Sequence, residues 1–354
     1  MKTLLAACLV LSFFYLLASG LSSSQGAPPA ATARAAATAS AAAPTTQPVE
    51  PMPEGGVREW INVESPSMKR SIRAVVLLPP GYKESPEKRY PVLYTLHGMG
   101  APYATYTEMA PLRKAIKDRP MIVASFDCDR AGWYIDSPKK PNNQFETFFF
   151  KEFLPYVESH YRTNSQRAVT GFSMGGFGAF HYMLTKPEMF SSVSAHSGAF
   201  FRFRDANGRG GGGFLQELMG DPAENREAYQ RLDIAGRIEQ YVKSGTRLPP
   251  MLIHCGTEDG LLPNNRDFCK LLTEQNKLIA GEVAKDPSLA SETDATKKAK
   301  AQDALMLAKR LEFLYVESPG AHNWIFWRGA SEAMIDFHWR SFRDAPKPAA
   351  PAAK

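Results

Sequence analysis

Cysteine is scarce in this chain, with four residues among 354. Cys8 lies in a segment that we expect to be removed, which leaves Cys128, Cys255 and Cys269. An odd number without metal-type spacing allows either one disulfide with a free thiol or three buried thiols. In neither case does cysteine chemistry drive the protein, and the sequence calls for no metal and no organic cofactor.

A long apolar run is also missing, because the run at residues 3–17 is shorter than the roughly 20 residues that a membrane span needs. Lys2 precedes this run and small residues follow it at 18–20, as in a secretory signal peptide. We therefore predict a signal peptide at residues 1–20, a secreted or periplasmic location, and no stable membrane insertion after its removal. An uncut membrane anchor is the alternative.

Concentrated positive charge is absent, although the formal net charge is +6. Basic residues are scattered, apart from a modest cluster at residues 297–310 within an alanine-rich helical pattern. A solvated helix face explains this cluster, whereas nucleic-acid binding needs a basic stripe with interleaved aromatic residues or a known motif. We expect no nucleic-acid partner, and the sequence does not indicate an oligomeric state.

Charged and large apolar residues are almost absent from residues 26–53, which consist mainly of Ala, Pro, Thr and Ser. Such a segment cannot bury enough surface to fold, so we predict a disordered linker at 21–55 and a similar disordered tail at 345–354. The folded domain then comprises residues 56–344. Two insertions are predicted within it: one at about 201–248 that shapes the substrate pocket, and a helical surface segment at about 280–308.

What the domain does contain is a regular alternation of strand and helix patterns. Several of the apolar runs are continuous, as buried parallel strands require. The predicted strands are 57–63, 71–78, 91–96, 121–126, 167–171, 191–195, 250–254 and 312–316, and the predicted helices are 112–117, 145–160, 176–184 and 264–275. This order indicates an α/β fold with a mostly parallel sheet and helices on both faces, preceded by two antiparallel edge strands.

The strongest motif is Gly-Phe-Ser-Met-Gly-Gly at residues 171–176, between a predicted strand and a predicted helix. Glycines flank Ser173 on both sides, which is typical of a sharp strand-to-helix corner that exposes a strained serine. The helix that follows would bring free amides and its dipole to the serine hydroxyl. A glycine-rich turn that happens to contain a serine is the alternative interpretation.

A nucleophilic serine needs a base and an acid, which typically follow it in the order acid, then histidine, each after a strand. His322 lies just past the last predicted strand, and position and order favour it over His196 as the base. Asp259 follows the preceding strand and is the predicted acid, with Glu258 and Asp267 as alternatives. Ordinary turn chemistry also explains an aspartate next to a glycine.

The tetrahedral intermediate needs two preorganised hydrogen-bond donors for its oxyanion. We predict the backbone N–H groups of Met174, directly after the nucleophile, and of Met99, in the His-Gly-Met-Gly turn at 97–100. Gly98 and Gly100 would let this turn approach closely. His97 is expected to have a structural role.

Together these motifs resemble the esterase D-like group of α/β hydrolases, which contains feruloyl and acetyl xylan esterases, S-formylglutathione hydrolases, enterochelin esterases and mycolyltransferases. The resemblance covers about residues 72–342, without the 280–308 insertion, which is unusual for the group. It implies an α/β-hydrolase fold, a triad of Ser173, Asp259 and His322, and an oxyanion hole at Met99 and Met174. An aromatic segment at 127–134 also resembles the group.

The sequence thus predicts an exported serine carboxylester hydrolase that acts on a small-molecule or polysaccharide-linked ester, with carbohydrate-linked and phenolic esters as candidates. An acyltransferase with the same triad is the first alternative, and a non-catalytic surface module is the second. Candidate residues of the substrate pocket are Trp133, Tyr134, His196 and Trp324, and Trp327 could also line it. Burial in the core is the alternative for each of these aromatic side chains.

Overall fold

The computed structural model describes residues 49–200 and 212–344. The predicted signal peptide, residues 21–48 of the predicted linker and the predicted C-terminal tail lie outside these residues. Among the helices of the described chain, none combines the length and the hydropathy that crossing a membrane requires.

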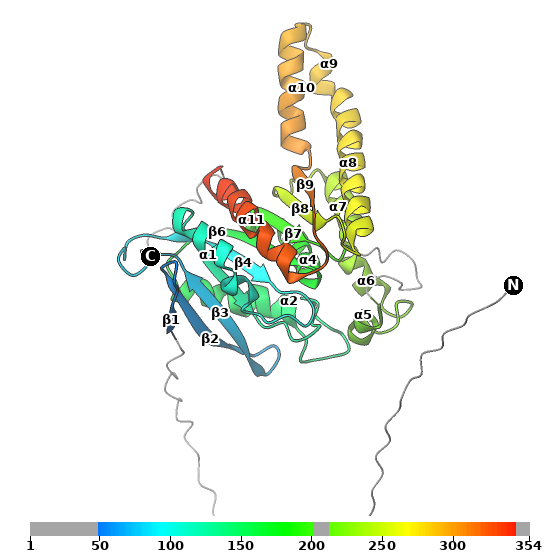
Figure 1. Cartoon of the computed structure of the whole chain (residues 1–354). Helices are drawn as coiled ribbons and strands as arrows, with labels where there is room; N and C mark the ends of the chain where they lie inside the picture. Colours follow the sequence, from blue (N-terminus) through cyan, green and yellow to red (C-terminus); the bar gives the residue numbers. More distant parts are fainter. Residues whose placement is uncertain (1–48, 201–211, 345–354) are drawn as a thin grey trace, which may run out of the picture. The chain divides into compact units, whose positions relative to one another are not determined.

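The described residues form a nine-stranded sheet with the order β1-β2-β3-β5-β4-β6-β7-β8-β9 (Figure 1). Strands β1 to β3 and the pair β3–β5 are antiparallel, and the pairs from β5 through β4 to β9 are parallel. This confirms the predicted fold class. The strands are β1 Val49–Pro51, β2 Val57–Ser65, β3 Arg70–Leu78, β4 Tyr90–Leu96, β5 Ile122–Phe126, β6 Thr163–Phe172, β7 Ser192–His196, β8 Met251–Gly256 and β9 Phe313–Ser318.

The first strand, β1, corrects the predicted boundary between linker and domain. Val49 pairs with Glu59 of β2, and Met52 is buried, so residues 49–55 belong to the folded domain. A short edge strand needs only its backbone groups to pair, and its proline is tolerated there. Because this pairing does not depend on side-chain type, the prediction from composition placed the end of the linker too late in the chain.

Helices cover both faces of the sheet and confirm the predicted layers. Helix α11 packs across β6, β7 and β8 and lies beside α1 on one face, whereas α4, α7 and α8 pack together on the other (Figure 1). The predicted helix 145–160 is α2, a π-helical turn at Phe149–Phe153 and α3. The main helices are α1 Ala110–Asp118, α2 Phe145–Phe148, α3 Leu154–His160, α4 Met174–Thr185, α7 Ile234–Ser244, α8 Leu262–Ala284 and α11 Trp324–Asp344.

Part of the predicted 201–248 insertion belongs to the basic fold. It contains α5 Gly212–Met219, α6 Arg226–Leu232 and α7. Buried residues of α7, such as Ile238, and the hydrogen bond from the Tyr241 hydroxyl to the Leu184 carbonyl join this helix to α4. Because a parallel crossover from β7 to β8 needs a helix, α7 is that helix rather than an added element.

The predicted 280–308 insertion is a helical hairpin. Helix α8 continues to Ala284, and α9 Pro287–Ala290 leads to α10 Ala295–Lys309, which returns alongside α8 and buries none of its residues (Figure 1). At the base of the hairpin, the Asn276 side chain bonds both backbone groups of Leu311, at 2.8 and 2.9 Å. The hairpin is therefore fixed at its base by this hydrogen-bonded pair, and Val283 and Leu289 are buried at its far end.

Candidate active site

The parallel strands bring the predicted triad to one edge of the sheet. Ser173 follows β6, Asp259 lies beyond β8, and His322 lies beyond β9. Carboxyl ends of parallel strands share one edge of a sheet, which is where α/β folds place their ligands. Residues nearly 150 positions apart in sequence therefore meet.

Ser173 lies in a strained corner between β6 and α4. Its φ of 56° and ψ of −121° place it in a region that non-glycine residues rarely adopt, at a cost of roughly 1–3 kcal/mol. A side chain at Gly171 would come within 2.1 Å of the Gly175 backbone, and one at Gly175 within 2.0 Å of the Leu96 carbonyl oxygen. The two glycines are therefore required by close backbone contact, as the motif predicts.

His322 joins the serine to the acid. Its Nε2 lies 3.0 Å from Ser173 Oγ, and its Nδ1 lies 3.0 and 3.1 Å from the two carboxylate oxygens of Asp259. A carboxylate only accepts hydrogen bonds, so Nδ1 carries the proton and Nε2 is left to accept the serine hydroxyl proton. This is the arrangement that a general base requires.

Asp259, rather than either alternative, is the acid that reaches His322. Its side chain is fully buried, whereas Glu258 and Asp267 are exposed. Burial raises the pKa of Asp259, but hydrogen bonds from His322, the Ser197 hydroxyl and the Leu261 N–H outweigh this effect and hold the pKa below its usual value. The carboxylate is thus ionised and oriented at neutral pH.

The other downstream histidines have different surroundings. His181 is buried in α4 between Glu146 and Arg237. His254 bonds the Ser318 hydroxyl at 2.8 Å, and His338 bonds the hydroxyls of two serines of β7 at 2.8 Å each. These contacts are structural. Among the described residues, His322 is the histidine that bonds Ser173.

His196, the alternative base and a predicted pocket residue, is buried rather than exposed to substrate. It is 3% accessible, and neither of its ring nitrogens has a hydrogen-bond partner within the described chain. Its backbone carbonyl, however, accepts a hydrogen bond from the Ser173 N–H at 3.0 Å. The backbone of His196 therefore supports the corner, while its side chain stays in the core.

These buried imidazoles predict a loss of stability in acid. Burial, with the neighbouring imidazoles, lowers the pKa of His196 well below its usual value, and burial alone lowers the pKa of His254 to about 4 and that of His338 to about 3. The unfolded chain takes up these protons near pH 6.5 and the folded chain does not, so stability is complete above pH 6.5 and falls below it. At pH 5 His254 and His338 would each cost about 2 kcal/mol, and His196 acts in the same direction.

Urea unfolding between pH 8 and pH 5 measures this dependence. His196→Leu should be less sensitive to acid than the wild type, because its side chain has no charge to gain and no ring hydrogen bond to lose. Equal free energies of unfolding at pH 8 and pH 5 would contradict the assignment of these groups as buried and neutral.

The predicted oxyanion donors lie on two segments in close contact. Met174 is the first residue of α4, and the turn containing Met99 begins where β4 ends, against the backbone of Gly175. Within the described residues, neither the Met99 N–H nor the Met174 N–H has a hydrogen-bond acceptor. Both amides are therefore available to an anion formed beside Ser173.

Hydrogen bonds of the His97 and Tyr134 side chains fix the turn at residues 97–100. Nε2 of His97 accepts the Cys128 N–H at 3.0 Å, so its Nδ1 carries the proton and donates to the Gly98 carbonyl at 2.9 Å. The Tyr134 hydroxyl donates to the His97 carbonyl at 2.9 Å. His97 is thus structural, as predicted, and fixes the backbone that carries Met99.

Tyr134 and Trp133 are core residues and do not line an open pocket. Tyr134 is fully buried among aromatic rings. Trp133 is also buried, and it packs edge-to-face with Phe177, with the ring centroids 5.5 Å apart. Both have positive φ values, 59° and 55°. The aromatic segment at 127–134 therefore supports the site through packing, which its composition could not distinguish from contact with substrate.

Trp324 and Trp327 lie at the site itself, on the first turn of α11. Trp324 is half-buried, with its ring 5.8 Å from that of Phe172. Trp327 stacks on Phe172 at 4.4 Å and meets the His322 ring edge-on at 5.0 Å. The position of Trp324 next to the His322 loop favours Trp324 as the pocket residue, but Trp327, one helical turn further along, contacts both Phe172 and His322.

The three cysteines of the described residues are free thiols. Cys128, Cys255 and Cys269 are all buried and free within the described part of the chain. Burial raises the pKa of Cys255 and of Cys269 to about 12, so both remain protonated at neutral pH. Of the two possibilities left open by the sequence, the structure has three buried thiols.

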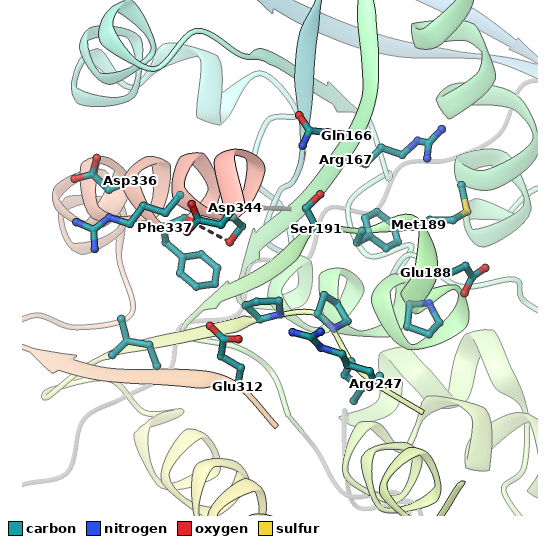
Figure 2. Close-up of a pocket in the computed structure, with 18 of the residues that line it drawn as sticks. Gln166, Arg167, Glu188, Met189, Ser191, Arg247, Glu312, Asp336, Phe337 and Asp344 are labelled. Atoms are coloured by element: carbon teal, nitrogen blue, oxygen red, sulfur yellow. Dashed lines mark hydrogen bonds between the residues drawn. The ribbon is translucent and has the colours of Figure 1, made fainter. Parts of the chain in front are cut away.

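A cavity of about 990 Å³ lies away from Ser173. Its lining comes from the amino-terminal ends of β6 to β9 and from α11, including Gln166, Ser191, Glu312 and Phe337 (Figure 2). Amino-terminal and carboxyl ends of parallel strands lie at opposite edges of a sheet. This cavity is therefore at the edge opposite the triad and cannot hold the bond that Ser173 would attack.

Comparison with known proteins agrees with this geometry. Residues 65–337 match the model of the family described as "Putative esterase". The chain belongs to this esterase family. Over 137 residues it is 40% identical to "Esterase Rv1288" of Mycobacterium tuberculosis strain H37Rv, an alignment that covers 37% of this chain and 30% of that relative. The match thus spans under a third of the relative's length.

Two solved structures share the esterase fold. One is an S-formylglutathione hydrolase from Agrobacterium tumefaciens, with a TM-score of 0.61 and 19% identity over 83% of this chain and 98% of that one. The other is the fluorophosphonate-binding serine hydrolase FphF of Staphylococcus aureus, with a TM-score of 0.62 and 18% identity. This match covers 80% of this chain and 98% of the FphF chain. At these identities the similarity establishes the α/β-hydrolase fold.

Proposed function

We propose that this protein is an exported serine carboxylester hydrolase that works through an acyl-enzyme. The observation that carries the proposal is the contact of His322 with Ser173 at 3.0 Å on one side and with the buried Asp259 on the other. Membership of the esterase family supports the same reaction class. The predicted signal peptide is the basis for export.

In the proposed mechanism, Ser173 Oγ attacks the ester carbonyl while Nε2 of His322 takes the hydroxyl proton. The N–H groups of Met99 and Met174 stabilise the oxyanion, and Asp259 stabilises the imidazolium. His322 then gives its proton to the leaving alcohol, and the C–O bond breaks. Water, deprotonated by His322, attacks the acyl carbon of the acyl-enzyme. The bond between this carbon and Ser173 Oγ then breaks, His322 returns the proton to Oγ, and the acid is released.

The substrate class that we propose is an ester of a carbohydrate or a phenolic acid. The side chain of His322 is 35% exposed and Ser173 is half-buried, so an ester attached to a larger molecule can approach. The same openness admits a sugar hydroxyl in place of water, which would make the protein an acyltransferase. These two reactions differ only in the acceptor.

The test is activity on a panel of acetyl, feruloyl, longer acyl and thioester substrates, with and without a sugar acceptor. We expect hydrolysis of at least one carboxylic ester, and covalent labelling of Ser173 by a fluorophosphonate detected by peptide mass spectrometry. Transfer to the sugar at the expense of acid release would establish the acyltransferase alternative. No label and no turnover on folded protein would support the non-catalytic surface module.

A further inference from the structure

A short segment after β7, residues 196–199, holds both backbone groups of Ser173. The Ser173 N–H donates to the His196 carbonyl at 3.0 Å, and the Ser173 carbonyl accepts the N–H of Ala199 at 3.2 Å. Gly198 lies between these two contacts and contributes its carbonyl to a third one, described below. The location of the strained nucleophile therefore depends on where this segment lies.

The turn that carries the proposed acid is also held by backbone groups. The Leu261 N–H donates to Asp259 Oδ1 at 2.7 Å, and the Leu262 N–H donates to the Asp259 carbonyl at 3.0 Å. Helix α8 begins at Leu262, so Asp259 lies directly before it. The location of the carboxylate therefore depends on the backbone at the start of α8.

Asn265, on the first turn of α8, bonds both of these segments with one amide group. Its Nδ2 donates to the Gly198 carbonyl at 3.0 Å and to the Leu261 carbonyl at 2.8 Å. The side chain is completely buried, and its two N–H bonds are both used. The Leu261 carbonyl also accepts the backbone N–H of Asn265 at 3.1 Å. The bond to Gly198 is thus the one that joins α8 to the segment around Ser173.

The orientation of the Asn265 amide follows from its partners. If the group were turned over, Oδ1 would face two carbonyl oxygens, and none of these three atoms can donate. Oδ1 itself is buried and has no hydrogen-bond partner within the described chain. A buried oxygen without a partner is unfavourable, so the two donors of Nδ2 are what a polar side chain contributes at this position.

We propose that Asn265 is a positioning residue that fixes the turn of Asp259 relative to the corner of Ser173. This inference rests on the proposed esterase function. The two loops follow different strands, and their separation decides whether His322 can contact both side chains. A displacement of about 1 Å can slow a reaction by about 100-fold, because the reacting groups must be in close contact. Both hydrogen bonds of the Asn265 side chain go to backbone carbonyls, so it acts through the positions of these loops.

The test compares Asn265→Leu with the wild type. Leucine has as many side-chain heavy atoms as asparagine but donates no hydrogen bond. We expect kcat on a short-chain aryl ester to fall about 10-fold to 100-fold, whereas KM should change by less than about 3-fold, because the reacting groups are displaced and the surface that binds the ester is not. The rate at which a fluorophosphonate labels Ser173 should fall by a similar factor, because labelling also requires an activated serine.

Asn265→Thr is the second variant, and it also applies if Asn265→Leu fails to fold. A threonine hydroxyl in a helix can donate to the carbonyl four residues earlier, which here is that of Leu261, but this shorter side chain loses the bond to Gly198. We expect kcat and the labelling rate of Asn265→Thr to lie between those of the wild type and those of Asn265→Leu. Wild-type values in Asn265→Thr would show that the bond to Gly198 has no effect on the site.

Asn276→Leu is the matched control, about three turns further along α8. Asn276 also bonds backbone groups, in this case both of those of Leu311, at 2.8 and 2.9 Å. The control should lower the melting temperature while kcat and the labelling rate stay at the wild-type level. Equal losses of kcat in Asn276→Leu and Asn265→Leu, or wild-type kcat in a folded Asn265→Leu protein, would overturn the proposal.

Ser173→Ala, measured beside these variants, distinguishes the two levels of the argument. If Ser173→Ala retains activity, the esterase function itself is wrong, and the role of Asn265 falls with it. If Ser173→Ala is inactive and Asn265→Leu is as active as the wild type, the esterase function stands and only the role of Asn265 is wrong.

Discussion

Ser173→Ala is expected to abolish ester hydrolysis and leave the fold intact. Loss of the nucleophile typically costs about 10⁴-fold or more in rate, and the residual activity comes from the oxyanion donors and binding alone. The Ser173 side chain is half-buried, and the substitution removes only its oxygen. Within the described residues, this oxygen forms a side-chain hydrogen bond with His322. The measurement is kcat on a short-chain aryl ester, with circular dichroism and melting temperature as checks of folding.

Because Ser173 has a φ of 56°, its replacement by alanine keeps a Cβ in the same strained conformation. A stability close to that of the wild type is therefore expected, and Ser173→Ala should also lose the fluorophosphonate label. Activity that persists near the wild-type level in a folded Ser173→Ala protein would sink the assignment of the nucleophile.

His322→Ala is expected to be as inactive as Ser173→Ala, again by about 10⁴-fold, because without a base the serine hydroxyl keeps its proton. The double variant should lose little more than either single variant, since the two residues act as a unit. The side chain of His322 is 35% exposed and lies in a loop, so its removal should cost little stability.

His196→Leu is the matched comparison for this assignment. Its side chain is buried and bonds no other residue in the described part of the chain, and its contribution to the corner is a backbone carbonyl that leucine retains. We expect it to keep most of the wild-type activity at pH 8. An inactive His196→Leu together with an active His322→Ala would reverse the assignment of the base.

Much of the candidate site was predictable because its parts are local. The glycines on either side of Ser173 are required because backbone atoms lie within a few ångströms of them. The motif therefore predicts this close backbone packing. The order of strands places Asp259 and His322 at the same edge of a parallel sheet without knowledge of any distance. The choice between Asp259 and Glu258, however, depends on which neighbouring carboxylate is buried, and their positions in the chain could only favour one of them.

The sequence by itself determined the succession of strands and helices along the chain, the corner at Ser173 and the candidates for base and acid, because short-range patterns encode these features. Only the tertiary structure decided which polar and aromatic side chains serve the site. Tyr134 supports the turn of Met99 from within the core, α7 belongs to the fold, and Trp327 contacts the ring of His322 and donates to the Ser197 hydroxyl. Most of these contacts join residues tens to more than a hundred positions apart, and no local pattern in the chain records them.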